Sequence, residues 1–396
     1  MKEGWEYKKL GEIATEMYRG SGIKRDQVTK EGTPCVRYGE IYTTYNISFD
    51  TCASHTKIEN VTSPKYFEYG DLLFAITGES VEDIGKTIAY LGDEKCLCGG
   101  DIICMKHHQN PKYLAYALST PDAIRQKGIG KTKLKVVHTN APALKAISIP
   151  LAPLSEQQSI VDYLDSAFAK IDAMKANAEK ALNEAKALFQ ASLKEMLEPK
   201  EGWEEKKLKD FATEFYRGSG VKRDQVTEKG ISCVRYGEIY TKYNYHFNKC
   251  DSHTLAEYVS SPKYFENGDI LFAITGESVE EIGKSIAYTG NEKCIAGGDI
   301  VVMKHTYEPR YISYALSTPS AVKQKGRGKT KLKVVHTNIP SLEEIIIPIA
   351  PMNDQIRIAD TLDSLKSKVD RLQENYDKIS QECDALKQAI LRQVFE

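Results

Sequence analysis

The sequence lacks any apolar run long enough to cross a membrane, and its opening residues, MKEGWEYKKL, contain no apolar signal-peptide core. It also lacks a disulfide framework, because its nine cysteines are odd in number and form no dense pattern. An excess of charge is missing too, since the net charge is −1. We therefore expect a cytoplasmic protein with reduced thiols, in which any nucleic-acid contact depends on local positive charge.

A nucleotide-binding loop is also missing. Such a loop needs Gly-x4-Gly-Lys-Ser/Thr, but position 125 is Arg in the segment that ends in Gly130-Lys131-Thr132, and six residues separate Gly78 from Gly85. The sequence thus predicts no nucleotide hydrolysis by this chain.

A methyltransferase motif is no better supported. Asn110-Pro111-Lys112-Tyr113 faintly resembles the Asn-Pro-Pro-Tyr of amino-methyltransferases, but Glu308 replaces the Asn in a second copy of this segment. A proline at the first turn of a helix is the simpler interpretation.

The cysteines leave one metal-binding alternative open. Two residues separate Cys52 from His55, and two separate Cys250 from His253, while Cys35 and Cys96 also recur in the second half of the chain. Three thiols and an imidazole are a zinc-like ligand set. However, no Cys-x2-Cys occurs, and single cysteines are commonly small core residues, so we predict no catalytic residue, no metal site and no cofactor.

The dominant feature present is an internal duplication. A shift of 198 residues aligns the two halves without a gap at about 60% identity, with roughly 70% in the first 150 positions and about 40% in the remainder. A period of this length indicates two duplicated domains, each large enough for its own core.

Each half ends in a heptad pattern that predicts a long coiled-coil helix of about 60 Å. The expected seam of the second helix is Ile358, Leu362, Leu365, Val369, Leu372, Tyr376, Ile379, Cys383, Leu386 and Ile390. The expected seam of the first is Ile160, Leu164, Ala167, Ile171, Met174, Ala178, Ala181, Ala185, Leu188 and Ser192. Because the first seam is rich in alanine, a bulky helix can approach it closely, so the two helices should pair.

The globular parts are expected to be α+β and mostly antiparallel. Strands are predicted at 36–42, 72–76 and 101–105, and a helix at 111–120. We expect domains at 1–152 and 199–350, and spacer helices at 153–198 and 351–396, with Ser155 and Gln158 forming a capping box at the start of the first helix.

Basic residues gather in two places in each half. One is a glycine-rich run in which Arg125, Lys127, Lys131, Lys133 and Lys135 lead to His138 and Asn140, with no acid among them. The other is the turn at 18–25. Basic side chains beside glycines suit a phosphate backbone, although a solvated strand face is the alternative.

The candidate phosphate contacts are Arg19, Lys24, Arg25, Lys131, Lys133, Lys135 and His138, and in the second half Arg217, Lys222, Arg223, Arg327, Lys329, Lys331, Lys333 and His336. The second loop also contains Lys323, Lys325 and Asn338. Candidates for contact with base edges are Arg37, Tyr38, Thr77 and Glu79, with Arg235, Tyr236, Thr275 and Glu277. Arginine reads guanine and an acid accepts from the cytosine amino group.

The order of several segments, present twice, resembles the specificity subunit of type I restriction–modification systems. These segments are GWEYKKLGEIA, GDLLFAITGES followed by Gly85-Lys86, and IPLAPLSEQQSIVDYLD, which recurs as IPIAPMNDQIRIADTLD. Asn353-Asp354 stands where the family usually has a small residue and Glu. The resemblance covers essentially the full chain.

The resemblance implies two target-recognition domains that each read half of a split DNA site, separated by two antiparallel spacer helices. It also implies partner methyltransferase subunits, expected to be two, restriction subunits where the system has them, and no chemistry by the chain itself. The alternative is a non-catalytic nucleic-acid-binding scaffold of another defence or methylation complex.

The near identity of the two halves adds one expectation of its own. Two readers related by a pseudo-twofold axis should read an interrupted inverted repeat. We expect any asymmetry to come from the differences at Thr44/Lys242, Ile47/Tyr245 and Ser48/His246.

Overall fold

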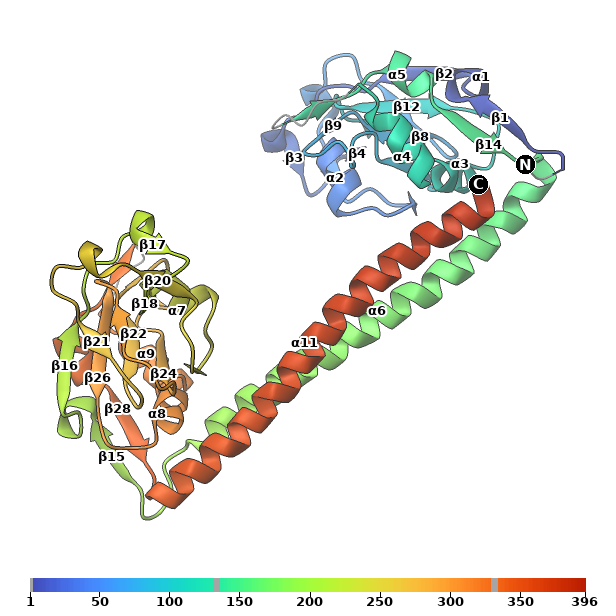
Figure 1. Ribbon diagram of the computed structural model, residues 1–396. Helices are drawn as coiled ribbons and strands as arrows, with labels where there is room; N and C mark the ends of the chain where they lie inside the picture. The colour runs from blue at the N-terminus through green and yellow to red at the C-terminus, as the bar shows by residue number, and fades with distance from the viewer. Residues whose placement is uncertain (1–2, 131–135, 329–333) are drawn as a thin grey trace. The chain divides into compact units, whose positions relative to one another are not determined.

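The chain folds into two compact units. The computed structural model describes residues 3–130, 136–328 and 334–396. Unit 1 contains Met1–Ala178 and Tyr376–Glu396, and unit 2 contains Glu179–Asn375. Each unit combines one globular domain with parts of two long helices, α6 (Leu154–Met196) and α11 (Met352–Phe395) (Figure 1). The predicted pair of α+β domains with two long helices is confirmed.

The first domain is built from short elements. They are β1 Glu6–Lys9, α1 Leu10–Ile13, β2 Glu16–Arg19, η1 Arg25–Gln27, β3 Val28–Thr29, β4 Thr33–Val36, α2 Tyr38–Thr43, β5 Ser48–Phe49, β6 Ser54–Thr56, η2 Ile58–Asn60, β7 Tyr66–Phe67, β8 Leu72–Ala75, β9 Thr77–Gly78, β10 Thr87–Tyr90, β11 Cys96–Cys98, β12 Ile102–Lys106, α3 Pro111–Ala117, α4 Pro121–Gly128, β13 Val137–His138, α5 Ala141–Lys145 and β14 Ser148–Leu151.

The second domain repeats this order. Its elements are β15 Glu204–Lys207, η3 Leu208–Asp210, β16 Glu214–Arg217, η4 Arg223–Gln225, β17 Val226–Thr227, β18 Ile231–Val234, α7 Tyr236–Thr241, β19 His246–Phe247, β20 Ser252–Thr254, η5 Ala256–Tyr258, β21 Tyr264–Phe265, β22 Ile270–Ala273, β23 Thr275–Gly276, β24 Ser285–Tyr288, β25 Cys294–Ala296, β26 Ile300–Lys304, α8 Pro309–Ala315, α9 Pro319–Lys325, β27 Val335–His336, α10 Ile339–Glu343 and β28 Ile346–Ile349.

Each domain contains two five-stranded sheets and two two-stranded sheets. In the first domain the orders of the five-stranded sheets are β2-β12-β8-β10-β5 and β3-β6-β4-β11-β7, and the second domain has the corresponding orders. Most neighbours are antiparallel, as expected, but β10 pairs with β5 and β11 pairs with β4 in parallel. In Figure 1, β3, β4, β9 and α2 lie at one end of the first domain, and β1, β14 and α3 lie at the other.

The strand β8 explains the layering, because its side chains alternate between two cores. Leu72 and Phe74 point to a core shared with α3 and the long helices. Leu73 and Ala75 point to a core between the two sheets. The domain therefore consists of helices, a first sheet and a second sheet, with the central strands β8 and β10 fully buried.

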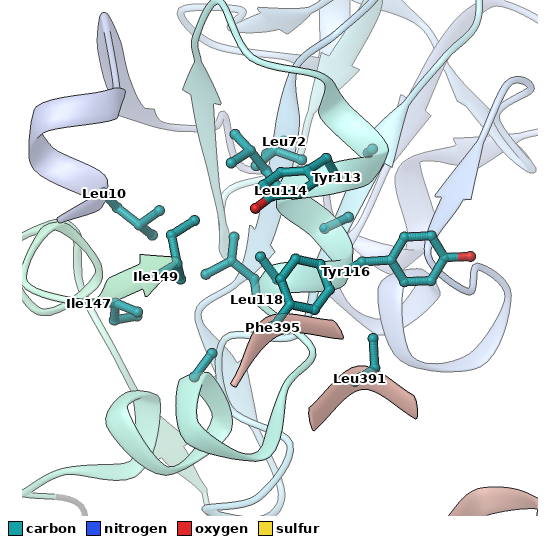
Figure 2. Packing of buried hydrophobic residues seen from close by; sticks show 14 of the residues in the cluster. Leu10, Leu72, Tyr113, Leu114, Tyr116, Leu118, Ile147, Ile149, Leu391 and Phe395 are labelled. Atoms are coloured by element: carbon teal, nitrogen blue, oxygen red, sulfur yellow. The ribbon is translucent and has the colours of Figure 1, made fainter. Parts of the chain in front are cut away.

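Unit 1 is completed by the last turns of α11. Leu391 and Phe395 are buried among Tyr113, Leu114 and Ile149 of the first domain (Figure 2). In the same unit, Lys387 pairs with Asp172 and, nearer the start of α11, Asp384 pairs with Lys175 at 3.6 Å. The two helices therefore run antiparallel where they pair in this unit.

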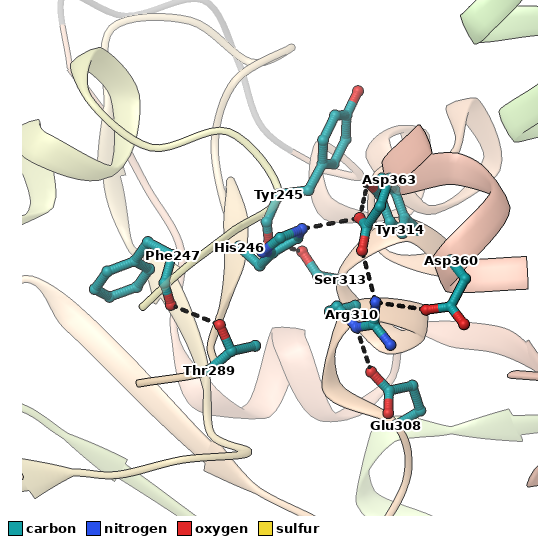
Figure 3. A network of polar contacts seen from close by, with 10 residues as sticks. All are labelled: Tyr245, His246, Phe247, Thr289, Glu308, Arg310, Ser313, Tyr314, Asp360 and Asp363. Carbon is teal, nitrogen blue, oxygen red and sulfur yellow. Dashed lines mark hydrogen bonds and ion pairs between the residues drawn. The ribbon is translucent and has the colours of Figure 1, made fainter. Parts of the chain in front are cut away.

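Unit 2 joins its domain to the helices through a polar network (Figure 3). The Arg310 guanidinium donates to Asp363 at 2.7 Å and to Asp360 at 2.8 Å, and His246 Nε2 lies 2.8 Å from Asp363 Oδ1. Burial alone would raise the pKa of Asp363, but hydrogen bonds from His246, Tyr314 and Arg310 lower it to about 2. The carboxylate is therefore held charged.

This network corrects one expectation. Tyr245 packs on Tyr314 with ring centroids 4.7 Å apart and on Phe189 of α6 at 5.6 Å, while His246 contacts α11. The differences at Ile47/Tyr245 and Ser48/His246 therefore change how the domain meets the helices, and we no longer assign them to recognition.

The heptad seams were predicted correctly only in part. Ile358, Leu362 and Leu164 are buried as expected, but Leu188 and Leu386 are exposed by 61% and 47%. A straight helix has 3.6 residues per turn, so a 3.5-residue seam turns by about 20° per heptad. The side chains that face the domains are then one residue later in the sequence than the expected seam, as for Phe189 and Leu391.

The predicted strand over 36–42 was wrong. The strand β4 ends at Val36, and α2 follows at once because Glu40 caps it. Glu40 Oε2 accepts the Arg37 backbone N–H at 2.7 Å. The predicted strands at 72–76 and 101–105 do appear, as β8 and β12. None of the helices in the described part of the chain is both long and apolar enough to span a bilayer.

Candidate nucleic-acid interface

One cleft in each domain gathers many of the predicted contact residues. The first cleft holds about 640 Å³ and the second about 1010 Å³. The first is lined by Gly22, Ile23, Lys24, Arg25, Arg37, Tyr38, Gly39, Glu40, Thr43, Gly99, Gly100 and Asp101. The second is lined by Arg217, Gly220, Val221, Lys222, Arg223, Arg235, Tyr236, Gly237, Glu238, Thr241, Lys242, Ser252, Gly297, Gly298 and Asp299.

The start of α2 forms one wall of the first cleft. Glu40 is buried there, accepting both the Arg37 backbone N–H and the Ser54 hydroxyl. Arg37 and the exposed Tyr38 are thereby fixed at the turn between β4 and α2. The second cleft repeats this wall, with Glu238 accepting from Arg235 N at 2.9 Å and from Ser252 at 2.6 Å.

The basic turn also lines the cleft. Lys24 and Arg25 are exposed, and no acid among the described residues pairs with either. Arg19 is different, because its guanidinium donates to Asp101 at 2.7 Å and to the Gly100 carbonyl. Arg217 makes the same contacts with Asp299 and Gly298. Arg19 and Arg217 thus hold part of the cleft wall in place.

A second hollow adjoins the first cleft at Tyr38 and contains the other predicted base contacts. Thr77 and the exposed Glu79 line it, together with Val136. Thr77 Oγ1 lies 3.1 Å from His138 Nδ1, so β9 and β13 bring these two predicted residues together. In the second domain Thr275 and His336 are 3.2 Å apart in the same way, and Glu277 is exposed.

Two side chains near the cleft have shifted pKa values. Burial raises the pKa of the Cys35 thiol to about 12, with Glu40 raising it further and Arg37 opposing this. Lys86, part of a Gly-Lys-Thr sequence, has its pKa lowered by burial. Its amino group donates to the carbonyls of Tyr42 and Tyr45, so it supports α2 from below.

The basic loop predicted at 125–140 was partly wrong. Lys127 is buried, and its amino group donates to Leu118 O at 2.8 Å and to Thr87 Oγ1 at 3.1 Å. Arg125 pairs with Asp122, one turn earlier on α4. Asn140 caps α5 by accepting from Ala143 N at 3.0 Å. These three side chains have structural partners, which the sequence alone could not reveal.

The remaining loop residues stay predictions. Lys131, Lys133, Lys135, Lys329, Lys331 and Lys333 lie outside the described residues. Arg327 is exposed and lines a separate hollow beyond α9, with Lys323 and Val279.

The other sequence candidates have simple structural roles. Asn110 caps α3 by accepting from Tyr113 N at 3.1 Å, which fits the helix-start interpretation. All nine cysteines are buried free thiols. Within the described part of the chain, no three His, Cys, Asp or Glu side chains gather as metal ligands.

Several cleft residues were missed by the sequence reasoning. The missed residues all line the cleft, and they are Gly22, Gly39, Asp101 and Glu40, the last of which accepts from Ser54. The only signal in the sequence was that these residues are identical in the two copies. Many buried core residues are identical in the two copies as well, so this signal does not single out the cleft. Their role becomes visible only when the turn at 22–25 and the start of α2 are brought together.

The fold therefore defines a tandem-domain protein with an equivalent cleft in each domain and a shared pair of long helices. The chain belongs to the family described as type I restriction modification DNA specificity domain, whose model matches residues 2–184 and 200–381. It is 29% identical over 199 residues to a putative type I restriction enzyme MjaX specificity subunit of Methanocaldococcus jannaschii. That alignment covers 46% of this chain and 44% of the archaeal protein, so it spans less than half of either.

Solved structures agree on the fold. A chain from a structure concerning complex assembly and conformational transition of the type I R-M system is 18% identical, with a TM-score of 0.76 over 100% of this chain and 98% of that one. The HsdS subunit from Thermoanaerobacter tengcongensis is 16% identical, with a TM-score of 0.57 over 100% and 97% of the two chains.

Proposed function

We propose that this chain is the DNA-reading specificity subunit of a type I restriction–modification complex. The observation that carries the proposal is the pair of equivalent clefts, each with exposed, unpaired basic residues beside an exposed tyrosine, in a chain of this family. Basic groups without acid partners suit phosphates, and arginine and acidic groups suit base edges. Each domain would read one half of a bipartite site in double-stranded DNA.

The catalytic steps are assigned to partner chains. We expect two adenine methyltransferase subunits, and restriction subunits where the system has them, to bind this chain in the cytoplasm. Lys86 belongs to the Gly-Lys-Thr sequence and Asn110 to the methyltransferase-like segment, and both are occupied by hydrogen bonds with the backbone. This supports a reading role for the chain, not a catalytic one. The chain alone should therefore neither methylate nor cleave DNA, nor hydrolyse ATP.

The test is to map methylated adenines across the genome in cells with and without this chain. We expect one bipartite motif to lose methylation when the chain is removed. A purified chain that transferred a methyl group or hydrolysed ATP without partners would contradict the non-catalytic assignment. An unchanged methylation pattern would contradict the proposal as a whole.

A further inference from the structure

Two glycines in the first cleft are not required by the fold. Gly22 and Gly39 both line the cleft, and neither has a positive φ. A Cβ added to either would meet no heavy atom within 4 Å. Gly220 and Gly237 show the same in the second cleft.

A third glycine beside this cleft shows the contrast. A Cβ on Gly99 would lie 2.6 Å from the Val36 carbonyl oxygen, so the fold itself excludes a side chain there. No such collision explains Gly22 or Gly39. Glycine at these two open positions of the cleft is explained if a ligand approaches the backbone closely.

Arg37 supplies the second observation. Its backbone is fixed by Glu40, yet its Nε is buried and has no hydrogen-bond partner among the described residues. Arg235 Nε is in the same state in the other domain. A buried donor without a partner is destabilising, and here the two copies repeat it at equivalent positions. Because this Nε is enclosed, a ligand acceptor would satisfy it once the guanidinium turns toward the cleft.

The neighbouring arginine sharpens the assignment. Arg19 is satisfied by Asp101 and Gly100 and cannot easily serve a ligand as well. Lys24 and Arg25 are exposed at the rim, where a phosphate can reach them. Arg37 shares the cleft lining with Glu40 and Asp101, whose negative charge disfavours a phosphate there. A base pair suits this position better, because guanine offers two acceptors to arginine.

We propose that Arg37 and Arg235 are the specificity-determining side chains that each read a guanine in the major groove, and that Gly22, Gly39 and their equivalents leave room for the base pair. This inference rests on the proposed function and names the residue and base behind it. Because the two clefts carry the same side chains at these positions, the same guanine should occur in both half-sites.

The experiment uses the full chain purified with the methyltransferase that co-purifies with it, and a library of randomised DNA. Arg37→Gln should lose its preference for guanine at one position of one half-site, a preference of about 5- to 150-fold for a bidentate contact. Arg235→Gln should lose it in the other half-site only. Each variant thus has the unchanged domain as its internal control.

Two further variants separate reading from folding. Gly39→Ala adds a methyl group that touches no protein atom, so thermal stability should hold while DNA affinity falls at least tenfold. Lys24→Gln should weaken binding to all sequences equally and leave the base preference unchanged.

Retention of guanine at both half-sites by Arg37→Gln would overturn the inference, and so would unchanged affinity in Gly39→Ala. Either result, with DNA still selected by the wild-type complex, leaves the proposed function standing. A wild-type complex that selects no DNA sequence would instead refute the proposed function and the inference with it.

Discussion

The ring of Phe395, in the last turn of α11, lies with its centroid 5.3 Å from that of Tyr113 in α3. Trp5 completes the group, 6.3 Å from each of them. The core of the first domain is therefore closed by the helix that follows the second domain. In unit 2 the equivalent position is taken by the end of α6, where Leu193 and, just after the helix, Leu197 are buried.

This arrangement predicts which unit a helix variant destabilises. Leu391→Ala with Phe395→Ala should destabilise unit 1 by several kcal/mol, because each buried truncation typically costs about 2–5 kcal/mol. Hydrogen exchange should show lost protection in β8 and little change in β22. The matched variant Leu193→Ala with Leu197→Ala should give the reverse pattern. Equal loss in both units from either variant would contradict the assignment.

Lys127 gives a prediction about pH. Burial lowers its pKa to about 7, well below its usual 10.5. Between these values the unfolded chain binds a proton that the folded chain does not, so the free energy of unfolding should rise with pH, by at most about 1.4 kcal/mol per pH unit. Denaturant unfolding at pH 7, 8 and 9 measures this slope. Below pH 7 both states are protonated and the contribution is flat.

Lys127→Met is the control for this slope. The variant should flatten the pH dependence of unit 1, and Lys325→Met should do the same in unit 2, because burial lowers the pKa of Lys325 to about 7 as well. Other titrating groups are common to all the variants and cancel in the difference from wild type. Slopes that do not differ between wild type and either variant would show that these lysines keep their protons when the chain is folded.

The exposed basic turn predicts a salt dependence. Lys24→Gln with Arg25→Gln should weaken binding to every DNA sequence and reduce the slope of log K against log salt by roughly two, about one for each lost phosphate contact. The charge-matched control is Lys9→Gln with Lys145→Gln, two exposed residues remote from the cleft lining. If both variants lowered the slope equally, the turn would have no special role.

The sequence predicted the features that depend on local pattern. The duplication, the long helices and the strands β8 and β12 follow from identity and periodicity, and the structure contains them. It predicted the wrong state for 36–42 because the valine, isoleucine and tyrosines there are residue types typical of a strand. The Glu40 cap, three residues after Arg37, was the stronger signal.

The candidate site was harder to predict because burial and pairing are three-dimensional. Lys127 and Arg125 stand in a basic run, yet one is enclosed by α3 and β10 and the other is paired with Asp122. Conversely, nothing in the sequence distinguished Arg37, whose Nε has no hydrogen-bond partner among the described residues, from Arg19, whose side chain has two partners. The same residue type therefore holds the cleft together in one place and keeps a buried donor without a partner among the described residues in the other.

The similarity of the two clefts predicts the form of the DNA site. VRYGEIY, FAITGES and KTKLKVVHTN recur unchanged in both halves, so the two readers should select nearly the same bases. We expect methylome mapping to return an interrupted inverted repeat, or a site one base away from it. Each mismatched base pair typically costs about 1–3 kcal/mol, so the preference should be plain. Two unrelated half-site sequences would refute this prediction.

The departure from that symmetry should come from Lys242. Its amino group lies 3.1 Å from Asp251 and 3.7 Å from Glu238 at the second cleft, whereas the first domain has Thr44 and Ala53 at the equivalent positions. A paired cation at the cleft changes the charge that a base edge meets. Thr44→Lys with Ala53→Asp should therefore give the first domain the preference of the second, and selection from randomised DNA should return a more symmetric site. His246→Ser is the control, because His246 faces α11 and its loss should leave the base preference unchanged. The assignment fails if His246→Ser alters the selected bases and the Thr44→Lys, Ala53→Asp variant does not.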